Sequence, residues 1–149
     1  MKVSDWLKQH PMHAGVVQEN WELKQIMQKL LGNSRLNDLY VINPQQQVIG
    51  HLSYQKLAKL TLAEHCSSHT RSQILERVAP GTAAELMEVH FAKANPDENL
   101  NEVIVRQLDH WVEDLPVINQ QGKLLGVINL SDVLLEVMQE NAYPLNTGQ

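Results

Sequence analysis

The stretch Asp114-Leu115-Pro116-Val117-Ile118-Asn119 repeats the pattern of Asp38-Leu39-Tyr40-Val41-Ile42-Asn43, which lies 76 residues earlier (114 − 38). The same offset relates Gln47-Val48-Ile49-Gly50 to Lys123-Leu124-Leu125-Gly126, in a run of roughly 20 matching positions. Chance is a poor explanation, because turn residues and apolar positions match together. The chain therefore contains an internal repeat.

Each copy predicts the same order of elements. In the first copy, the β-branched run at residues 39–42 predicts a strand, the polar residues 43–46 a turn, and residues 48–52 a returning strand. Leu23 to Leu31, with apolar residues at helical spacing, predict a helix before this hairpin. In each copy a short leading strand is expected before the helix that precedes the hairpin, at residues 15–17 and at residues 91–94. The predicted unit is β-α-β-β-α, occurring twice.

Polar residues mark the expected starts of the helices. Asn20 and Asp97 are predicted to cap the helices that precede the hairpins, and Ser53 and Asn129 those that follow them. The helix after the second hairpin is expected to bury one face, formed by Val133, Leu134, Val137 and Met138. Between the copies, short helices are predicted to begin with the patterns Thr70-x-x-Gln73 and Thr82-x-x-Glu85.

Composition limits the class of protein. A net charge of −5 argues against a nucleic-acid partner held through its phosphates. The single cysteine, Cys66, rules out an intramolecular disulfide and favours a reducing compartment. No apolar run approaches the roughly 18 residues of a membrane span. We expect a cytoplasmic protein, or one at the cytosolic face of a membrane.

The second copy closely resembles the CBS repeat in residues 114–119, in Gly122 to Ile128 and in Asp132-Val133-Leu134. The first copy is more diverged, with Tyr40 where that family usually has proline. The resemblance covers the chain from about Val3 to Met138. It implies an α/β (α+β) fold, in which two β-α-β-β-α repeats pack with pseudo-two-fold symmetry as a tandem pair, or Bateman module.

The resemblance also implies an organisation and a role. Residues 1–61 would be the first repeat, 62–81 a linker with a short helix, 82–141 the second repeat and 142–149 a C-terminal tail. Such pairs often dimerise, and many bind AMP, ADP, ATP or a related ligand in clefts between the repeats. They regulate attached enzymes, channels and transporters.

Nucleotide-binding members of the family carry Ser or Thr, followed three residues later by Asp, at the end of the second hairpin strand. One carboxylate can accept hydrogen bonds from both ribose hydroxyls, and a helix N-terminus offers N–H groups to phosphate. Here Asn129 precedes Asp132, whereas Ser53 precedes Lys56, so each copy matches in part. We expect a ribose at Asp132, with Lys56 reaching the phosphates.

The adenine ring would occupy an apolar slot in the second copy. Its walls are predicted to be Phe91, Ala92, Ala94, Leu115, Pro116 and Val117. A structural interpretation stays open, in which Ser53 and Asn129 only cap helices and Asp132 only complements the positive end of the helix dipole. Lys56 would then be a solvated lysine.

No other constellation indicates chemistry. His65 and His69 share a helical spacing beside Cys66, but two ligands underfill a tetrahedral metal site, so a polar connector is expected. No nucleophile and base are paired by a motif, which predicts that the chain is not an enzyme. Two functions remain, a nucleotide sensor and a ligand-free dimerisation module. In either case the alternative stays open that the chain is the cytosolic tail of a chloride or magnesium transporter.

Overall fold

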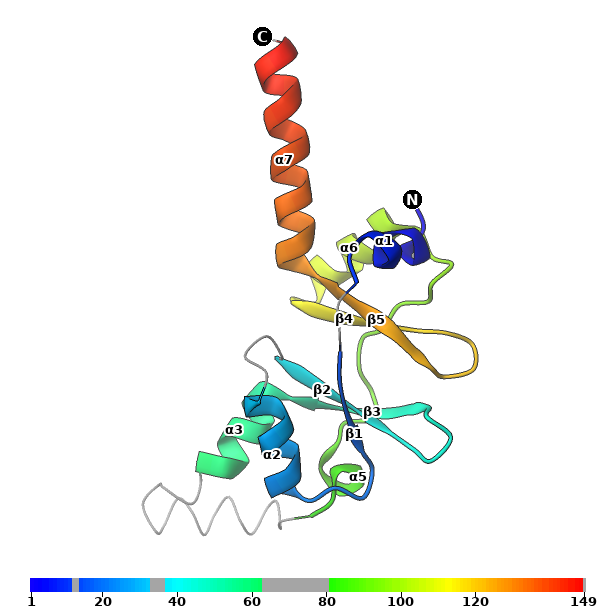
Figure 1. Ribbon diagram of the computed structural model, residues 1–149, viewed down its shortest axis with the longest axis vertical. Helices are drawn as coiled ribbons and strands as arrows, with labels where there is room; N and C mark the ends of the chain where they lie inside the picture. The colour runs from blue at the N-terminus through cyan, green and yellow to red at the C-terminus, as the bar shows by residue number, and fades with distance from the viewer. Residues whose placement is uncertain (12–13, 33–36, 63–80, 149) are drawn as a thin grey trace. The chain divides into compact units, whose positions relative to one another are not determined.

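The computed structural model describes residues 1–11, 14–32, 37–62 and 81–148, with side chains up to Gln139. These residues form two compact units, each with its own core (Figure 1). Unit 1 comprises residues 1–13, 92–120 and 124–149. Unit 2 comprises residues 14–91 and 121–123. The α+β fold expected from the repeat is confirmed.

The described residues of unit 2 form a three-stranded sheet and three helices. The sheet has the order β1-β2-β3, with β1 parallel to β2 and β2 antiparallel to β3. Its strands are β1 (Gly15–Gln18), β2 (Asp38–Ile42) and β3 (Val48–Ser53). Its helices are α2 (Leu23–Leu31), α3 (Tyr54–Leu62) and α5 (Ala83–Leu86). The first leading strand and the first hairpin lie where the sequence predicts them.

The core of unit 2 lies on one face of this sheet. Strand alternation brings Leu39 and Val41 of β2 to the face that Leu52 of β3 shares. The helices contribute apolar residues at helical spacing, namely Ile26, Leu30, Leu57, Leu60, Ala83 and Leu86. All are nearly or fully buried, so this packing is a main source of the unit's stability.

Unit 1 repeats the arrangement with a smaller sheet. Its strands β4 (Asp114–Ile118) and β5 (Leu124–Asn129) form an antiparallel hairpin. Its helices are α1 (Val3–Gln9), α6 (Leu100–Asp109) and α7 (Leu130–Gly148). Both hairpins carry an irregularity at equivalent places, between Val41 and Ile42 and between Val117 and Ile118. The internal repeat therefore extends to the backbone detail of the hairpins.

The prediction of a second leading strand at residues 91–94 is wrong for all but its last residue. Only Ala94 pairs with the sheet, through an isolated parallel bridge to Val117. The Ala94 amide donates to Pro116 O and the Ile118 amide donates to Ala94 O, both at 2.9 Å. A parallel ladder would next need an N–H from Pro96, which proline lacks, so the pairing ends after one residue.

The first helix of each repeat packs into the core that is formed mainly by the other repeat. The helix α1, at the start of the first repeat, buries Val3 and Trp6 in the core of unit 1 with the strands of the second repeat. The Val3 amide donates to Glu98 O at 3.0 Å, which fixes this helix beside the start of α6. Conversely, α5 buries Ala83 and Leu86 in unit 2. We call α1 and α5 the exchanged helices.

The caps predicted for α2 and α6 are wrong by two residues. Glu22, not Asn20, caps α2, and its side chain forms a capping box with Gln25. Asn99, not Asp97, caps α6, and its oxygen accepts from the amides of residues 101 and 102. Each cap follows a turn that the apolar periodicity did not reveal, so the helix begins later than the first polar residue.

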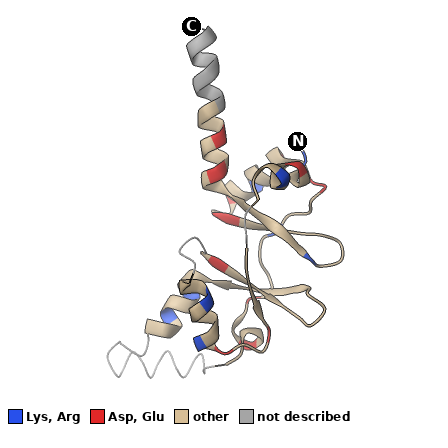
Figure 2. Ribbon diagram, in the orientation of Figure 1, with Lys and Arg blue, Asp and Glu red and all other residues tan. Residues whose placement is uncertain are grey.

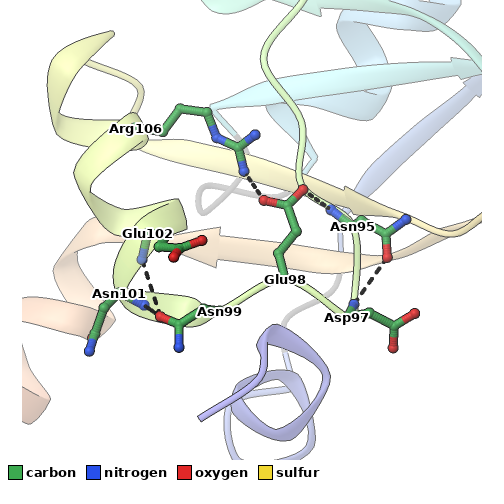
Figure 3. A network of polar contacts seen from close by, with 7 residues as sticks. All are labelled: Asn95, Asp97, Glu98, Asn99, Asn101, Glu102 and Arg106. Atoms are coloured by element: carbon green, nitrogen blue, oxygen red, sulfur yellow. Dashed lines mark hydrogen bonds and ion pairs between the residues drawn. The ribbon is translucent and has the colours of Figure 1, made fainter.

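The turn before α6 is a polar network (Figure 3). Asn95 accepts from the Asp97 amide at 3.0 Å, and Glu98 accepts from the Asn95 amide at 3.0 Å. The other carboxylate oxygen of Glu98 forms an ion pair with Arg106 of α6 (Figure 3). This network holds the Glu98 carbonyl oxygen in the place where it accepts the hydrogen bond from the Val3 amide of α1.

Two short helices were expected between the copies, beginning at Thr70 and at Thr82. Thr82 is the N-cap residue of α5 as predicted, but its hydroxyl donates to the Glu85 carboxylate at 3.1 Å, so the reciprocal capping box does not form. The helix predicted from Thr70 lies outside the described residues.

The buried face predicted for α7 is wrong beyond its first turn. Val133 is buried, but three of the four residues are exposed, namely Leu134, Val137 and Met138. Leu135 is exposed as well. The core of unit 1 ends at Val133, because α1 and α6 already cover this face of the small sheet.

Candidate functional site

The candidate site begins where β5 ends and α7 starts. Asn129 is the last residue of β5, and its side-chain oxygen accepts from the amides of Ser131 at 2.9 Å and Asp132 at 3.2 Å. Its side-chain nitrogen donates to Asp114 Oδ1 at 2.6 Å, which links the helix start to β4. The cap predicted at Asn129 is confirmed, and both polar atoms of this side chain are engaged within the protein.

The free amides expected at the start of α7 are not available. The Leu130 amide donates to Glu113 O at 2.9 Å, and the next two amides bond the side chain of Asn129. The first three amides of this helix are therefore hydrogen-bonded within the protein. Asparagine's short side chain and the Glu113 carbonyl satisfy these donors internally.

Unlike the side chain of Asn129, the carboxylate of Asp132 is free to accept hydrogen bonds from a ligand. It lies in the first turn of α7 and is half-buried. Within the described part of the chain, its carboxylate has no hydrogen-bond or ion-pair partner. A carboxylate can accept several hydrogen bonds. It is the group at this end of β5 with acceptor capacity to spare.

The equivalent place in the first repeat carries different chemistry. Ser53 ends β3, and its hydroxyl oxygen accepts from the Lys56 amide at 3.1 Å, so the predicted cap is confirmed. Lys56 occupies the position of Asp132 and is half-buried as a residue. The first repeat therefore has a cation where the second has an anion.

Most of the predicted apolar slot belongs to the core of unit 1. The backbone bonds between Ala94 and β4 bring Ala94 beside Val117, and Ala92 packs against the same core. Leu115 and Val117 are fully buried, and Ala94 is 2% exposed. These side chains face α1 and α6. Pro116 lies on the opposite face of the strand and is buried as well.

Phe91 lies in unit 2, within an aromatic cluster that the sequence did not indicate. Its ring centroid lies 6.5 Å from that of Tyr40 and 5.9 Å from that of His51. Tyr40 and His51 are opposite each other in the pairing of β2 and β3. His51 Nε2 also lies 3.2 Å from Asp38 Oδ1. Aligning the two strands of the predicted hairpin residue by residue would have placed Tyr40 opposite His51. It would not have shown that Phe91 lies near them.

The described residues show no further site. His65, Cys66 and His69, the candidates for metal or redox chemistry, lie outside the described part of the chain. Among the residues with described positions, no group of three or more His, Cys, Asp or Glu could hold a metal ion. None of the helices in that part of the chain is both long and apolar enough to cross a membrane.

Comparison with known proteins finds a family-model match in the second repeat. Residues 83–139 match the family model of the CBS domain. No curated protein matches the sequence. The match includes α5, the hairpin β4–β5 and the start of α7, with Asn129 and Asp132.

Solved structures of CBS-domain proteins share the fold of nearly the whole chain. A CBS domain-containing protein from Thermotoga maritima has a TM-score of 0.73 at 21% identity, covering 93% of this chain and 95% of that one. The protein CBSX2, in complex with AMP, has a TM-score of 0.71 at 20% identity, covering 94% of this chain and 98% of that one. The cytosolic domain of the Mg2+ channel MgtE, in complex with ATP, has a TM-score of 0.61 at 21% identity. That match covers 81% of this chain and 44% of the MgtE chain.

Proposed function

We propose that this chain is a regulatory module that binds an adenine-type nucleotide at Asp132. Its residues 83–139 match the family model of the CBS domain, and solved CBS-domain proteins share its fold. The observation that carries the proposal is the uncommitted, half-buried carboxylate of Asp132 at the end of β5. Two solved structures with this fold contain AMP and ATP. Binding would change the activity of an attached or partner protein, such as a transporter or an enzyme, in the cytoplasm or at the cytosolic face of a membrane.

The chemistry of the site favours the nucleoside part of the ligand. The two ribose hydroxyls can both donate to one carboxylate, and charge-assisted bonds of this kind are stronger than neutral ones. Phosphate groups gain little from α7, because its first amides are engaged. Lys56 remains the predicted phosphate partner. The base would contact Pro116 and backbone atoms near Ala94.

Calorimetry with adenosine, AMP, ADP and ATP tests the proposal, using the wild-type chain and Asp132→Asn. Replacing the carboxylate by an amide keeps the size of the side chain but removes its negative charge and one of its two acceptor oxygens. We expect at least about a tenfold loss of affinity, since hydrogen bonds to charged groups contribute about 1.5–3 kcal/mol. The loss should be similar for each compound that the wild type binds, because each contains the same ribose.

The chain offers a matched control in Glu102. It lies three residues after the cap Asn99, as Asp132 lies three residues after Asn129, and both amides donate to their cap. Glu102→Gln therefore removes the same charge from the same kind of helix position, away from β5. It should leave nucleotide affinity unchanged. Wild-type protein that gives no heat with any of the four compounds would contradict the proposal.

A second candidate function is a ligand-free interaction module. Ser53 and Asn129 both act as helix caps, which accounts for them without a ligand. The exposed apolar residues of α7 would then serve protein contacts. Sedimentation that shows a self-associating chain, together with calorimetry that shows no nucleotide binding, would favour this candidate. A stable monomer that binds nucleotide would exclude it.

A further inference from the structure

Two polar side chains are buried among the residues that the structure describes, and both are linked to the start of α7. Gln107 of α6 is 1% exposed and Asp114 of β4 is 8% exposed. Burying an amide or a carboxyl group is costly unless hydrogen bonds replace those to water. At an offset of 77 residues Gln107 corresponds to Leu30 (107 − 30), which is buried in the core of unit 2. An apolar side chain can therefore fill this place in the fold, so packing alone does not require glutamine.

The side-chain amide of Gln107 joins α6 to both strands of the hairpin. Its nitrogen donates to the carbonyl oxygen of Glu113, which precedes β4, and to that of Ile128 in β5, each at 3.0 Å. The Glu113 oxygen also accepts from the amide of Leu130, the first residue of α7, at 2.9 Å. Gln107 thus orients the carbonyl group to which the first amide of α7 is bonded.

Asp114 makes a second connection to the same helix start. Its Oδ1 accepts from the Asn129 side chain at 2.6 Å, and Asn129 in turn accepts from the amides of Ser131 and Asp132. One connection runs from Gln107 through a carbonyl group, and the other runs from Asp114 through the cap. Asp132 lies in this first turn of α7, so the direction of its carboxylate depends on both.

Stability does not account for the glutamine. Its Oε1 is buried and has no hydrogen-bond partner among the described residues. A buried acceptor without a partner is unfavourable. An apolar residue of the same length would remove this cost, and the Glu113 oxygen would keep its bond from Leu130. A local departure from the most stable choice is expected at functional sites.

We infer that Gln107 is a positioning residue of the nucleotide site, whose hydrogen bonds hold the start of α7 so that the Asp132 carboxylate can accept from both ribose hydroxyls. The inference rests on the proposed function and adds to it a residue that does not touch the ligand. Two bonds from one ribose to one carboxylate require a fixed orientation, because binding groups must be held to within about 0.5 Å of their productive geometry.

The two copies differ at both positions together. The second copy has Gln107 and Asp132, whereas the first has Leu30 and Lys56 at the matching places. The copy that lacks the carboxylate therefore also lacks the buried amide. In both copies a side chain caps the helix after the hairpin, so capping by itself does not require the amide.

Calorimetry with AMP and 2′-deoxy-AMP on the wild type and Gln107→Met tests this role. Methionine has nearly the length of glutamine but cannot donate a hydrogen bond. We expect AMP affinity to fall about fivefold, the effect of one typical hydrogen bond. 2′-Deoxy-AMP has one ribose hydroxyl fewer and should lose less, so the preference for AMP should shrink. Gln107 is uncharged, so the acidic residues on α7 stay in place and altered charge does not explain the loss (Figure 2).

Val103→Ala is the matched structural control. Val103 is fully buried and lies one turn before Gln107 on the same face of α6. Its truncation leaves a cavity in the same core, so the melting temperature should fall while the preference for AMP stays as in the wild type. Gln107→Met should show the reverse, an unchanged or higher melting temperature with a reduced preference. Gln107→Leu, which introduces the residue type of the first copy, is a second variant and should behave alike.

The inference and the proposed function fail separately. If the wild type binds AMP, and both Gln107 variants keep its affinity or lose affinity equally for both nucleotides, the inference is overturned and the proposed function stands. Wild-type protein that gives no heat contradicts the proposed function. Amide hydrogen exchange in the ligand-free chain then tests the positioning: Gln107→Met should speed exchange at Leu130, Ser131 and Asp132 but not within α6. Unchanged exchange at these three amides would overturn the inference.

Discussion

Gly50 and Gly126 occupy equivalent positions in the two hairpins, and each lies against an exchanged helix or the residue that follows it. A Cβ atom at Gly50 would lie 2.2 Å from the sulfur of Met87 and 2.8 Å from its Cβ. At Gly126, the nearest atom would be a terminal methyl of Leu7, at 3.0 Å. The absence of a side chain thus permits close packing in both repeats, more tightly at Gly50.

We expect Gly50→Ala to destabilise the protein by about 1–3 kcal/mol, the usual cost of overpacking a filled core. Gly126→Ala should cost less, because only the far end of a flexible leucine must move. Urea unfolding, followed by circular dichroism, measures both. Equal losses for the two variants would show that the close approach of Met87 is not what requires glycine at Gly50.

The exchanged helices are the feature that matters most at the scale of elements. Trp6 of α1 is 4% exposed and Leu86 of α5 is 2% exposed, and each completes a core built mainly from the other repeat. His10 stacks on Trp6 with ring centroids 3.7 Å apart, and its Nε2 lies 3.6 Å from the Glu136 carboxylate of α7. The helix α1 therefore contacts the element that carries Asp132.

Removing the side chain of Trp6 should destabilise the second repeat, whose strands pack against it in the core of unit 1. Trp6→Ala is expected to cost about 3–5 kcal/mol, because it leaves a cavity in the core of unit 1. Hydrogen exchange should speed up in β4 and β5, which lie far away in sequence, before it does in the neighbouring β1.

Leu86→Ala is the reciprocal control. Its effect should appear in β2 and β3, although α5 directly precedes the second repeat in sequence. Faster exchange confined to the sequence neighbours of each substituted residue would contradict the exchange of helices.

At the scale of the whole molecule, neither compact unit coincides with one continuous half of the chain. Residues 1–13 belong to unit 1, and residues 83–91 belong to unit 2. The segment that matches the CBS family model, residues 83–139, therefore contains α5 but not the helix that completes its own core.

This division predicts the behaviour of fragments. Residues 82–149 alone should fail to give dispersed amide signals in an NMR spectrum, because Val3 and Trp6 are missing from the core. A fragment in which a flexible Gly/Ser linker joins residues 1–10 to residues 92–149 should fold, since it contains all of the core of unit 1. A well-folded 82–149 fragment would show that α1 is dispensable.

Much of this architecture follows from the sequence alone. The 76-residue offset predicts both hairpins, because strands and turns depend on local alternation and turn residues. The caps at Ser53 and Asn129 are equally local, since a short polar side chain reaches amides two or three residues away. The sequence also singled out Asp132, through the family pattern.

The tertiary structure decided what depends on contacts between distant segments. In the helices before the hairpins the two copies match at an offset of 77 residues, so Gln107 corresponds to Leu30 (107 − 30). Gln107 is nevertheless buried, and it donates to the carbonyl groups of Glu113 and Ile128, each at 3.0 Å. Helical spacing on α7 does not show that α1 already covers the sheet, so the sequence cannot tell that Met138 stays exposed. Nor does it show that the Glu113 carbonyl and Asn129 engage the first amides of α7. Periodicity records which face of an element is apolar, whereas its partner depends on the path of the whole chain.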